Sequence, residues 1–346
     1  MRRLALFLVL TIALLASAAA FDWWVDPFGQ VWKPDVLAAA RQQHCLVSEE
    51  LIGSRYWSFK RSVFFHRPTR AFVVGSSRVL KISGGPRFSN LGYPGSAPET
   101  ILRLFRSLPA RPTQTVLLGV EGFWFNARYA LPSTDLNAYK VLEYLLARGT
   151  FTHAVSLSHQ SAQLPWHRWK RDRIGTQCVL DRFEPTITWR LDGSRVWGWE
   201  LDPARFPKFH GGGFTGNLQT WRNGYFADWT TLDEPRIHAL EQALALARAR
   251  HWTVIGFPPP EPPHLLHVLE SDPRLAPQWN AYLRLMPQVF GRYGFKWANT
   301  VDGSTLRCRR SDFPDLFHTD ARCSRLLLGK LASAIDRKRG ILREIG

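Results

Sequence analysis

Two short segments, far apart in the chain, carry the residue types that activate a serine hydroxyl. The segment 72–78 (FVVGSSR) has the pattern of a buried strand that stops at a Gly-Ser-Ser turn, and this turn contains Ser77. Near the other end of the chain, Asp315 precedes His318 by three residues. A serine hydroxyl is a weak nucleophile until an imidazole accepts its proton, and a carboxylate can orient that imidazole. Ser77, His318 and Asp315 are therefore candidate nucleophile, general base and orienting acid of an acyl-transfer site.

Neither segment predicts this chemistry alone. A Gly-x-Ser after an apolar run is common at strand-to-helix turns, and a carboxylate near a histidine is common in surface loops. The hypothesis therefore depends on the segments that lie between them. The segment 90–96 (NLGYPGS) follows the serine turn, and 115–122 (TVLLGVEG) comes next, as a further apolar run with a polar end.

In this order, the four segments resemble the four motif blocks of the SGNH (GDSL-type) hydrolase superfamily. The Gly-Ser-Ser-Arg first block and the terminal Asp-x-x-His are similar to its membrane-anchored envelope branch, which includes relatives of the alginate O-acetylation and teichoic-acid D-alanylation proteins. The resemblance covers roughly residues 21–335 and is less recognisable between about 150 and 230. It also includes 254–260 (VIGFPPP), a strand that ends in a proline-rich loop.

The resemblance implies a role for each matching residue. Ser77 would attack an ester carbonyl, His318 would act as general base and then as acid, and Asp315 would orient His318. The oxyanion would be held by the backbone N–H groups of Ser77 and Gly95 and by an asparagine side chain. It implies no cofactor and no metal. The histidines suggest no metal site either, because His264 and His267 have no evident third ligand.

One position departs from the superfamily pattern. The Gly-x-Asn-Asp block aligns with 119–122, where the asparagine is replaced by Glu121. A carboxylate cannot donate a hydrogen bond unless it is protonated. Three interpretations remain open: an oxyanion hole with two donors, an oxyanion hole that Asn126 completes, or an oxyanion hole that has lost its function. Glu121 would then contact a substrate hydroxyl or pair with an arginine.

The N-terminus has the pattern of an export segment. Two arginines, Arg2 and Arg3, precede an apolar stretch from Leu4 to Ala20. This pattern is typical of a signal peptide or a membrane anchor. Residues 18–20 (AAA) would suit a signal peptidase, whereas Trp23 and Trp24 would suit an interfacial belt after an uncleaved anchor. We expect a periplasmic or cell-envelope protein anchored in the inner membrane, with cleavage as the alternative.

Amino-acid composition and net charge indicate which classes of molecule the protein can bind. The chain has 346 residues, 45% of them hydrophobic, and a net charge of +17, but it contains no nucleic-acid-binding motif. An exported basic protein is expected to meet anionic lipid or acidic polysaccharide instead. The densest basic and aromatic segment, 166–173 (WHRWKRDR), fits such a surface, although a solvated loop with half-buried tryptophans fits it equally.

The four cysteines fit an oxidising compartment. They are at positions 45, 178, 308 and 323, and none forms a Cys-x-x-Cys pair. Cys308 and Cys323 flank the Asp315–His318 segment, so a disulfide between them would restrain the general base. Four cysteines allow three pairings, and four buried free thiols are the alternative.

Alternating strands and helices predict an α/β fold. Strands are expected at 72–75, 88–91, 115–120, 252–257 and 295–299, and helices at 35–51, 98–108, 135–148, 234–250, 277–293 and 324–338. This alternation predicts three α/β/α layers around a mainly parallel sheet, of the flavodoxin-like type that the resemblance implies. The candidate site residues all follow strand ends and would gather at one edge.

The expected domain organisation has three parts. Residues 1–20 form the signal peptide or anchor, 21–66 a lead-in arm, and 67–340 the α/β domain, with an insertion at about 150–232. The insertion contains a hairpin signal, 186–191 and 195–200 around Asp192-Gly193.

The leading functional hypothesis is an O-acetyl transferase or esterase that acts on a glycan or lipid-linked sugar, with a membrane-bound acyl-transfer protein as a partner. The alternative is a non-catalytic SGNH-like protein that binds glycan or scaffolds an acylation complex. A broad lipase-like esterase is disfavoured, because the chain lacks a Gly-x-Ser-x-Gly elbow at Ser77.

Overall fold

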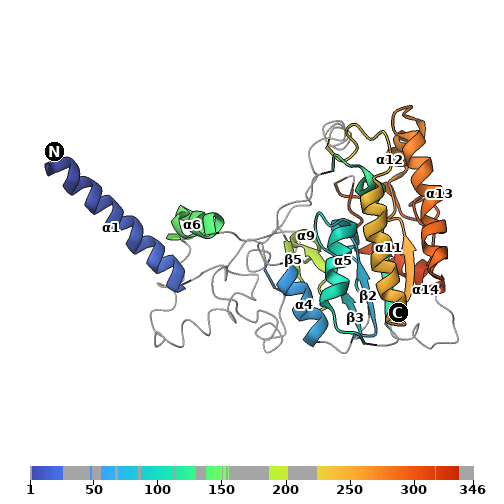
Figure 1. The fold of residues 1–346 in the computed structure, drawn as a ribbon, viewed down its shortest axis with the longest axis horizontal. Coiled ribbons are helices and arrows are strands. Elements are labelled where there is room, and N and C mark those ends of the chain that lie inside the picture. The colour runs from blue at the N-terminus through green and yellow to red at the C-terminus, as the bar shows by residue number, and fades with distance from the viewer. Residues whose placement is uncertain are drawn as a thin grey trace. The chain divides into compact units, whose positions relative to one another are not determined.

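The computed structural model describes residues 2–25, 47–48, 56–66, 69–84, 87–111, 114–129, 138–149, 151–152, 155, 187–201, 224–315 and 317–334 (Figure 1). The chain divides into two compact units. We call residues 60–132 and 192–346 the sheet unit, and residues 1–59 and 133–191 the N-terminal unit. This division places 192–232 with the sheet, whereas the sequence suggested an insertion that extends to about 232.

A five-stranded parallel sheet forms the centre of the sheet unit. Its strands are β2 (Ala71–Val74), β3 (Phe88–Asn90), β4 (Thr115–Gly119), β7 (Thr253–Phe257) and β8 (Lys296–Trp297). They lie in the order β3-β2-β4-β7-β8, and every neighbouring pair is parallel. Counted along the chain, this is the 2-1-3-4-5 order of doubly wound flavodoxin-like sheets, which hold ligands where the strand order reverses, between β2 and β4.

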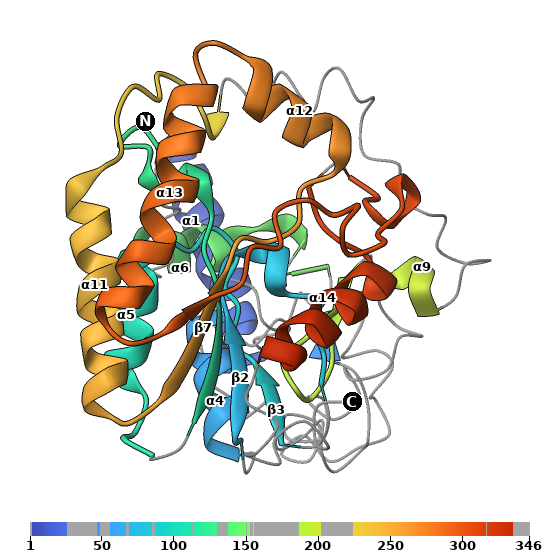
Figure 2. The ribbon, with the colours of Figure 1, turned by 90° about the vertical axis from the view of Figure 1, so that its right-hand side faces the viewer.

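Helices cover both faces of the sheet, as Figure 2 shows. The helices α5 (Pro98–Ser107), α11 (Glu234–Ala249) and α13 (Ala276–Arg292) lie on one side, and α14 (Ala321–Ala334) lies on the other. Successive strand side chains alternate between these faces. Phe72 packs on Phe105 of α5 and on Trp252, whereas Val73 belongs to the cluster under α14. Both faces are therefore buried, which explains why β2 and β4 are apolar throughout.

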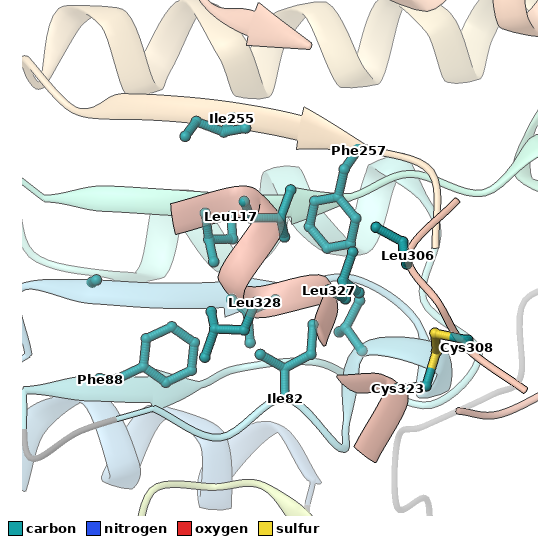
Figure 3. Close-up of a cluster of buried hydrophobic side chains, with 14 of the residues drawn as sticks. Ile82, Phe88, Leu117, Ile255, Phe257, Leu306, Cys308, Cys323, Leu327 and Leu328 are labelled. Atoms are coloured by element: carbon teal, nitrogen blue, oxygen red, sulfur yellow. A yellow bond between two sulfur atoms is a disulfide. The ribbon is translucent and has the colours of Figure 1, made fainter. Parts of the chain in front are cut away.

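The cluster under α14 links the sheet to the chain segment that carries the candidate base (Figure 3). Leu327, Leu328 and Leu331 of α14 pack in it with side chains from β2, β3, β4 and β7. Cys308 and Cys323 belong to the same cluster. The segment between them is thus fixed to the sheet at both of its ends.

The N-terminal unit contains one long apolar helix. This helix, α1 (Arg2–Val25), is long and apolar enough to cross a membrane, as a signal or as an anchor. It contacts α6 (Ala138–Leu146) within the same unit. A short strand, β1 (Val47–Ser48), pairs antiparallel with β5 (Ile187–Trp189).

Most of the predicted elements are confirmed, with boundary shifts of one to four residues in the regions described. Two predictions are wrong. Helical spacing was expected across 35–51, yet 47–48 form β1, and the rest of that range lies outside the described residues. The second hairpin arm was expected to reach 200, but β6 (Arg195–Trp197) gives way to the short helix α9 (Gly198–Leu201). Within the predicted lead-in arm lies the helix α4 (Tyr56–His66), for which no prediction was made.

One further helix was not predicted. The proline-rich segment after β7 runs into α12 (Pro263–Ser271), where Pro263 occupies the first turn. Proline is well tolerated there, since the first helical N–H groups have no partner within the helix. The segment 166–173 lies outside the described residues, as do Cys45 and Cys178.

Candidate active site

Ser77 lies in a tight turn at the carboxyl end of β2. Gly75 begins the turn with a φ of 154°, and a Cβ there would come within 3.0 Å of both Val79 and the Gly119 carbonyl oxygen. Ser76 then caps the short 3-10 helix Ser77–Val79 by accepting a hydrogen bond from the Arg78 N–H. The glycine and the capping serine together present Ser77 at the edge of the sheet.

The structure brings the three candidate residues together. His318 Nε2 lies 2.8 Å from Ser77 Oγ, and His318 Nδ1 lies 2.6 Å from Asp315 Oδ2. Asp315 Oδ1 also accepts hydrogen bonds from the backbone N–H groups of Phe317 and His318. The predicted contact between Ser77 and His318 is confirmed. The side chains of His318 and Asp315 remain 19% and 17% exposed, so both are partly open to solvent.

Electrostatics favour the protonation states that base catalysis needs. Burial lowers the pKa of His318, and together with the nearby charges of Arg195 and Arg78 it outweighs the opposing hydrogen bond and charge of Asp315. Burial alone would raise the pKa of Asp315, but its hydrogen bonds from His318 and Phe317 outweigh burial and hold that pKa below its usual range. The imidazole is therefore neutral and the carboxylate ionised at neutral pH. With Nδ1–H donated to Asp315, Nε2 is left to accept the Ser77 proton.

A disulfide holds the chain segment that carries the base. Cys308 and Cys323 are bonded, with their Cα atoms 5.2 Å apart, which confirms the predicted pairing. Arg322 forms an ion pair with Asp312 inside the same segment, and the Asp320 N–H donates to the Asp312 carbonyl. These restraints lie on either side of Asp315 and His318 and limit the positions that the base can adopt.

Arg78, directly after Ser77, bonds to three other loops at the edge of the sheet. Its guanidinium donates to Glu121 after β4 at 2.9 Å and to Glu261 in the loop after β7 at 2.5 Å. It also donates to the Pro260 carbonyl at 2.6 Å and, through Nε, to the Phe317 carbonyl at 3.2 Å. Phe317 is the neighbour of His318. Arg78 therefore connects the nucleophile turn to the base loop.

Glu121 belongs to this buried network. One carboxylate oxygen pairs with Arg78, and the other accepts the Ser76 hydroxyl at 2.5 Å. The side chains of Arg78, Glu121 and Glu261 are at most 5% exposed. Of the two roles considered for Glu121, the structure favours pairing with an arginine over contact with a substrate hydroxyl.

The titration of the three charged groups reflects their burial. Burial raises the pKa of Glu121, although Arg78 and Ser76 oppose it. Burial raises the pKa of Glu261 to about 7 despite its pairing with Arg78. For Arg78 itself, the two carboxylates outweigh burial and raise the pKa, so that it stays charged. The Arg78 guanidinium is thus the shared countercharge of two buried carboxyl groups.

Asn126 is not positioned at the triad. Its amide donates to the carbonyls of Tyr225 and Ala227, at 3.0 and 2.8 Å, and its oxygen accepts the Arg128 N–H. Both N–H groups are thereby used to hold the 225–227 segment. The structure gives no support to Asn126 as the missing oxyanion donor.

Gly95 lies in a loop that is tied to the nucleophile turn. The Tyr93 N–H donates to the Gly75 carbonyl at 2.8 Å, and the Ser96 N–H donates back to Tyr93. Gly95 has a φ of 67°, a conformation that glycine adopts without strain. These hydrogen bonds tie the loop that contains Gly95 to the turn that presents Ser77.

Several residues near the triad were not predicted from the sequence. Trp197 lies edge-on to His318, with ring centroids 6.4 Å apart, and Arg195 stacks on Trp197. On the other side, Tyr225 packs against Phe317. The Gly-Ser-Ser-Arg motif contained the only available signal for this environment, namely Arg78, because the other residues come from parts of the chain without a recognisable motif.

The described residues contain no group of three or more His, Cys, Asp or Glu side chains that could hold a metal ion. No protein-family model matches the chain, and no match is found among curated proteins. Fold and geometry define a doubly wound parallel α/β domain with a hydrogen-bonded Ser-His-Asp arrangement at its switch point.

Proposed function

We propose that this protein is a cell-envelope enzyme that transfers or hydrolyses an O-linked acyl group, with acetyl as the expected group, on a glycan or lipid-linked sugar. The single observation that carries the proposal is the hydrogen-bonded chain from Ser77 Oγ through His318 to Asp315. The motif order that resembles SGNH hydrolases supports it further. Helix α1 and the disulfide support an exported protein, which we place in the periplasm and anchor by α1.

In the proposed reaction, Ser77 Oγ attacks the ester carbonyl carbon while His318 Nε2 takes the hydroxyl proton. The oxyanion is held by the N–H groups of Ser77 and Gly95. Collapse of the tetrahedral intermediate breaks the ester C–O bond, and the departing alkoxide receives the proton from His318. The resulting acyl-serine is then attacked by water in an esterase or by a sugar hydroxyl in a transferase, again with His318 as the base.

A non-catalytic scaffold is the second candidate, and one observation favours it. The position expected to supply an oxyanion donor holds Glu121, which is already bonded to Arg78 and Ser76. Loss of one oxyanion donor typically lowers the rate by about 10²–10³. Two backbone donors therefore remain compatible with slow turnover, and for this reason we rank the enzyme first.

Labelling with a fluorophosphonate separates the two candidates. We expect the purified protein to be labelled at Ser77, and the label to be lost in Ser77→Ala and in His318→Ala. Ser333→Ala is the matched control, because Ser333 is an exposed serine on α14 whose hydroxyl only bonds back to its own helix. Absence of label in a folded wild-type protein would reject the enzyme and favour the scaffold.

A further inference from the structure

The N-terminal unit carries a row of exposed apolar side chains beside α1. Leu142 and Leu146 of α6 are 53% and 43% exposed, and Phe151 and Val155, just beyond the helix, are 42% and 44% exposed. Leu142 and Leu146 are four residues apart and lie on one face of α6. Leu145, on another face, is buried. Single exposed leucines are ordinary, but several large apolar side chains exposed on one short segment indicate a surface that meets something apolar.

This row is continuous with the apolar surface of α1. Helix α6 contacts α1 (Figure 1), and Phe151 packs edge-to-face on Phe21, with ring centroids 5.9 Å apart. The large apolar side chains of α1 from Leu4 to Leu15 are at least 50% exposed. Over this part of α1, no described residue covers the apolar surface that a bilayer would bury. The apolar row on α6 begins beside the C-terminal end of the same helix.

The residues at the two ends of α1 fix the level at which this contact occurs. Arg2 and Arg3 precede the apolar stretch, and the exposed Trp23 and Trp24 follow it, whereas Asp22 is buried. The apolar residues 4–21 span about 27 Å as a helix, which matches a hydrocarbon layer of about 30 Å. Phe21 then lies at the boundary between hydrocarbon and headgroups. Its partner Phe151 lies at the same depth.

We propose that α6 and the residues up to Val155 form a second membrane contact, which lies in the plane of the bilayer surface at the C-terminal end of α1. The occupant of the apolar row is the bilayer itself, because the row continues a surface that only lipid would cover. Leu142, Leu146, Phe151 and Val155 enter the boundary between headgroups and acyl chains, and the exposed Arg148 faces lipid phosphate. Nine residues extend only about 13 Å, so α6 lies on the membrane and does not cross it.

The second membrane contact would restrict the orientation of the protein relative to the membrane. A single helix leaves a tethered protein free to rotate about the helix axis, whereas a second contact beside it restricts that rotation. This inference does not depend on the proposed catalytic activity, since none of its residues belongs to the sheet unit. It does require that α1 is retained, because cleavage after Ala20 would remove the span that sets the depth of Phe21.

The test uses the full-length protein in phosphatidylcholine–phosphatidylglycerol vesicles that contain a phospholipid with a photoactivatable diazirine near the glycerol. After illumination, peptides are mapped by mass spectrometry. We expect label on α1 and on peptides from 141–155. In Leu142→Glu/Leu146→Glu the label on 141–155 should fall roughly tenfold while α1 remains labelled, because carboxylates resist transfer into the interface.

Ala245→Glu/Ala249→Glu is the matched control. Both alanines are exposed and lie four residues apart on α11 in the sheet unit, so two carboxylates are added outside the apolar row and the label on 141–155 should stay at the wild-type level. Circular dichroism in detergent verifies that each variant folds. Should the double variant misfold, the wild-type label map still decides the question. Label on α1 without label on 141–155, or equal label in a folded double variant, would overturn the proposal.

Discussion

Arg78 and Glu121 form a buried ion pair, 2.9 Å between Nη1 and Oε2, at the base of the Ser77 turn. The same guanidinium contacts Glu261 and the carbonyl of Phe317. The pair therefore couples the strand end that presents the nucleophile to the loop that presents the base. It also explains why a carboxylate can occupy a position where an amide was expected.

Removal of the cation should cost more than removal of one carboxylate. Arg78→Met leaves Glu121 and Glu261 buried without a countercharge, and we expect a loss of roughly 3–5 kcal/mol in the free energy of unfolding. Glu121→Gln leaves Arg78 paired with Glu261, and we expect a loss of roughly 1–2 kcal/mol. Urea denaturation of both variants measures the difference. Equal losses would contradict the description of Arg78 as the shared cation.

Glu121→Asn should lower esterase activity, although it restores the residue type of the superfamily motif. The shorter amide cannot keep both the Arg78 and Ser76 hydrogen bonds, so the Ser77 turn loses its support. We expect roughly a tenfold fall in kcat/KM for a small acetyl ester. Parallel kinetics with Ser77→Ala set the background. A rise in rate would instead show that the missing donor limits catalysis.

The pH dependence of activity should follow the lowered pKa of His318. A protonated imidazole cannot accept the Ser77 proton, so the rate rises as pH increases through the His318 pKa. Because burial, with the charges of Arg195 and Arg78, holds that pKa below 6.5, the acid limb of the rate should lie below pH 6.5. Asp315→Asn should reduce kcat by about 10⁴, through loss of the correct tautomer. A wild-type acid limb above pH 6.5 would contradict this assignment.

Thermal stability should decrease as the pH rises from about 5 to about 8, and Glu261 should be one cause. Burial raises the pKa of Glu261 from 4.5 to about 7. An acid with a higher pKa in the folded state stabilises the fold below its unfolded pKa, and this contribution is lost as pH rises through the folded pKa. Scanning fluorimetry should show a smaller decrease in Glu261→Gln than in wild type. Glu234→Gln, at an exposed position, should behave as wild type.

The disulfide should stabilise the base loop. Cys308→Ser/Cys323→Ser opens a loop with a sequence separation of 15, for which chain entropy predicts a loss of about 3 kcal/mol. We expect a lower melting temperature and weaker Ser77 labelling, because His318 lies inside this loop. Reductant should lower the melting temperature of wild type more than that of the double variant. Equal shifts in both would assign the effect of reductant to other cysteines.

The core strands and the triad could be predicted because their signals are local. Apolar runs such as 72–75 and 115–120 are buried on both faces, and Ser77 and His318 lie in short motifs. The Arg78 network could not be predicted in this way. Glu261 follows β7 and Arg78 follows β2, and the two meet because these strands lie on either side of β4 in the sheet. Sequence spacing does not encode this strand order.

A physical reason explains why each of the remaining elements was not predicted from the sequence. Helix α12 begins after a run of prolines, a composition that favours a loop over a helix. At Val47–Ser48, pairing with β5 prevails over helical spacing, so a tertiary contact decides the local structure. The contribution of Trp197 to the surroundings of His318 likewise depends on the fold that brings α9 and β6 to the site.

His318 follows Ser77 by 241 positions, and the last strand of the sheet precedes it. A chain threaded through a translocon with its N-terminus first would deliver the nucleophile early and the base near the end of transit. Ser77 would remain an unactivated hydroxyl until β8 joins the sheet, the disulfide forms and α14 packs on the hydrophobic cluster. Under the proposed function, premature acylation of the nascent chain would thereby be avoided. Proteolytic removal of the C-terminal segment from the folded protein would take His318 away from Ser77 and would leave the serine without its base.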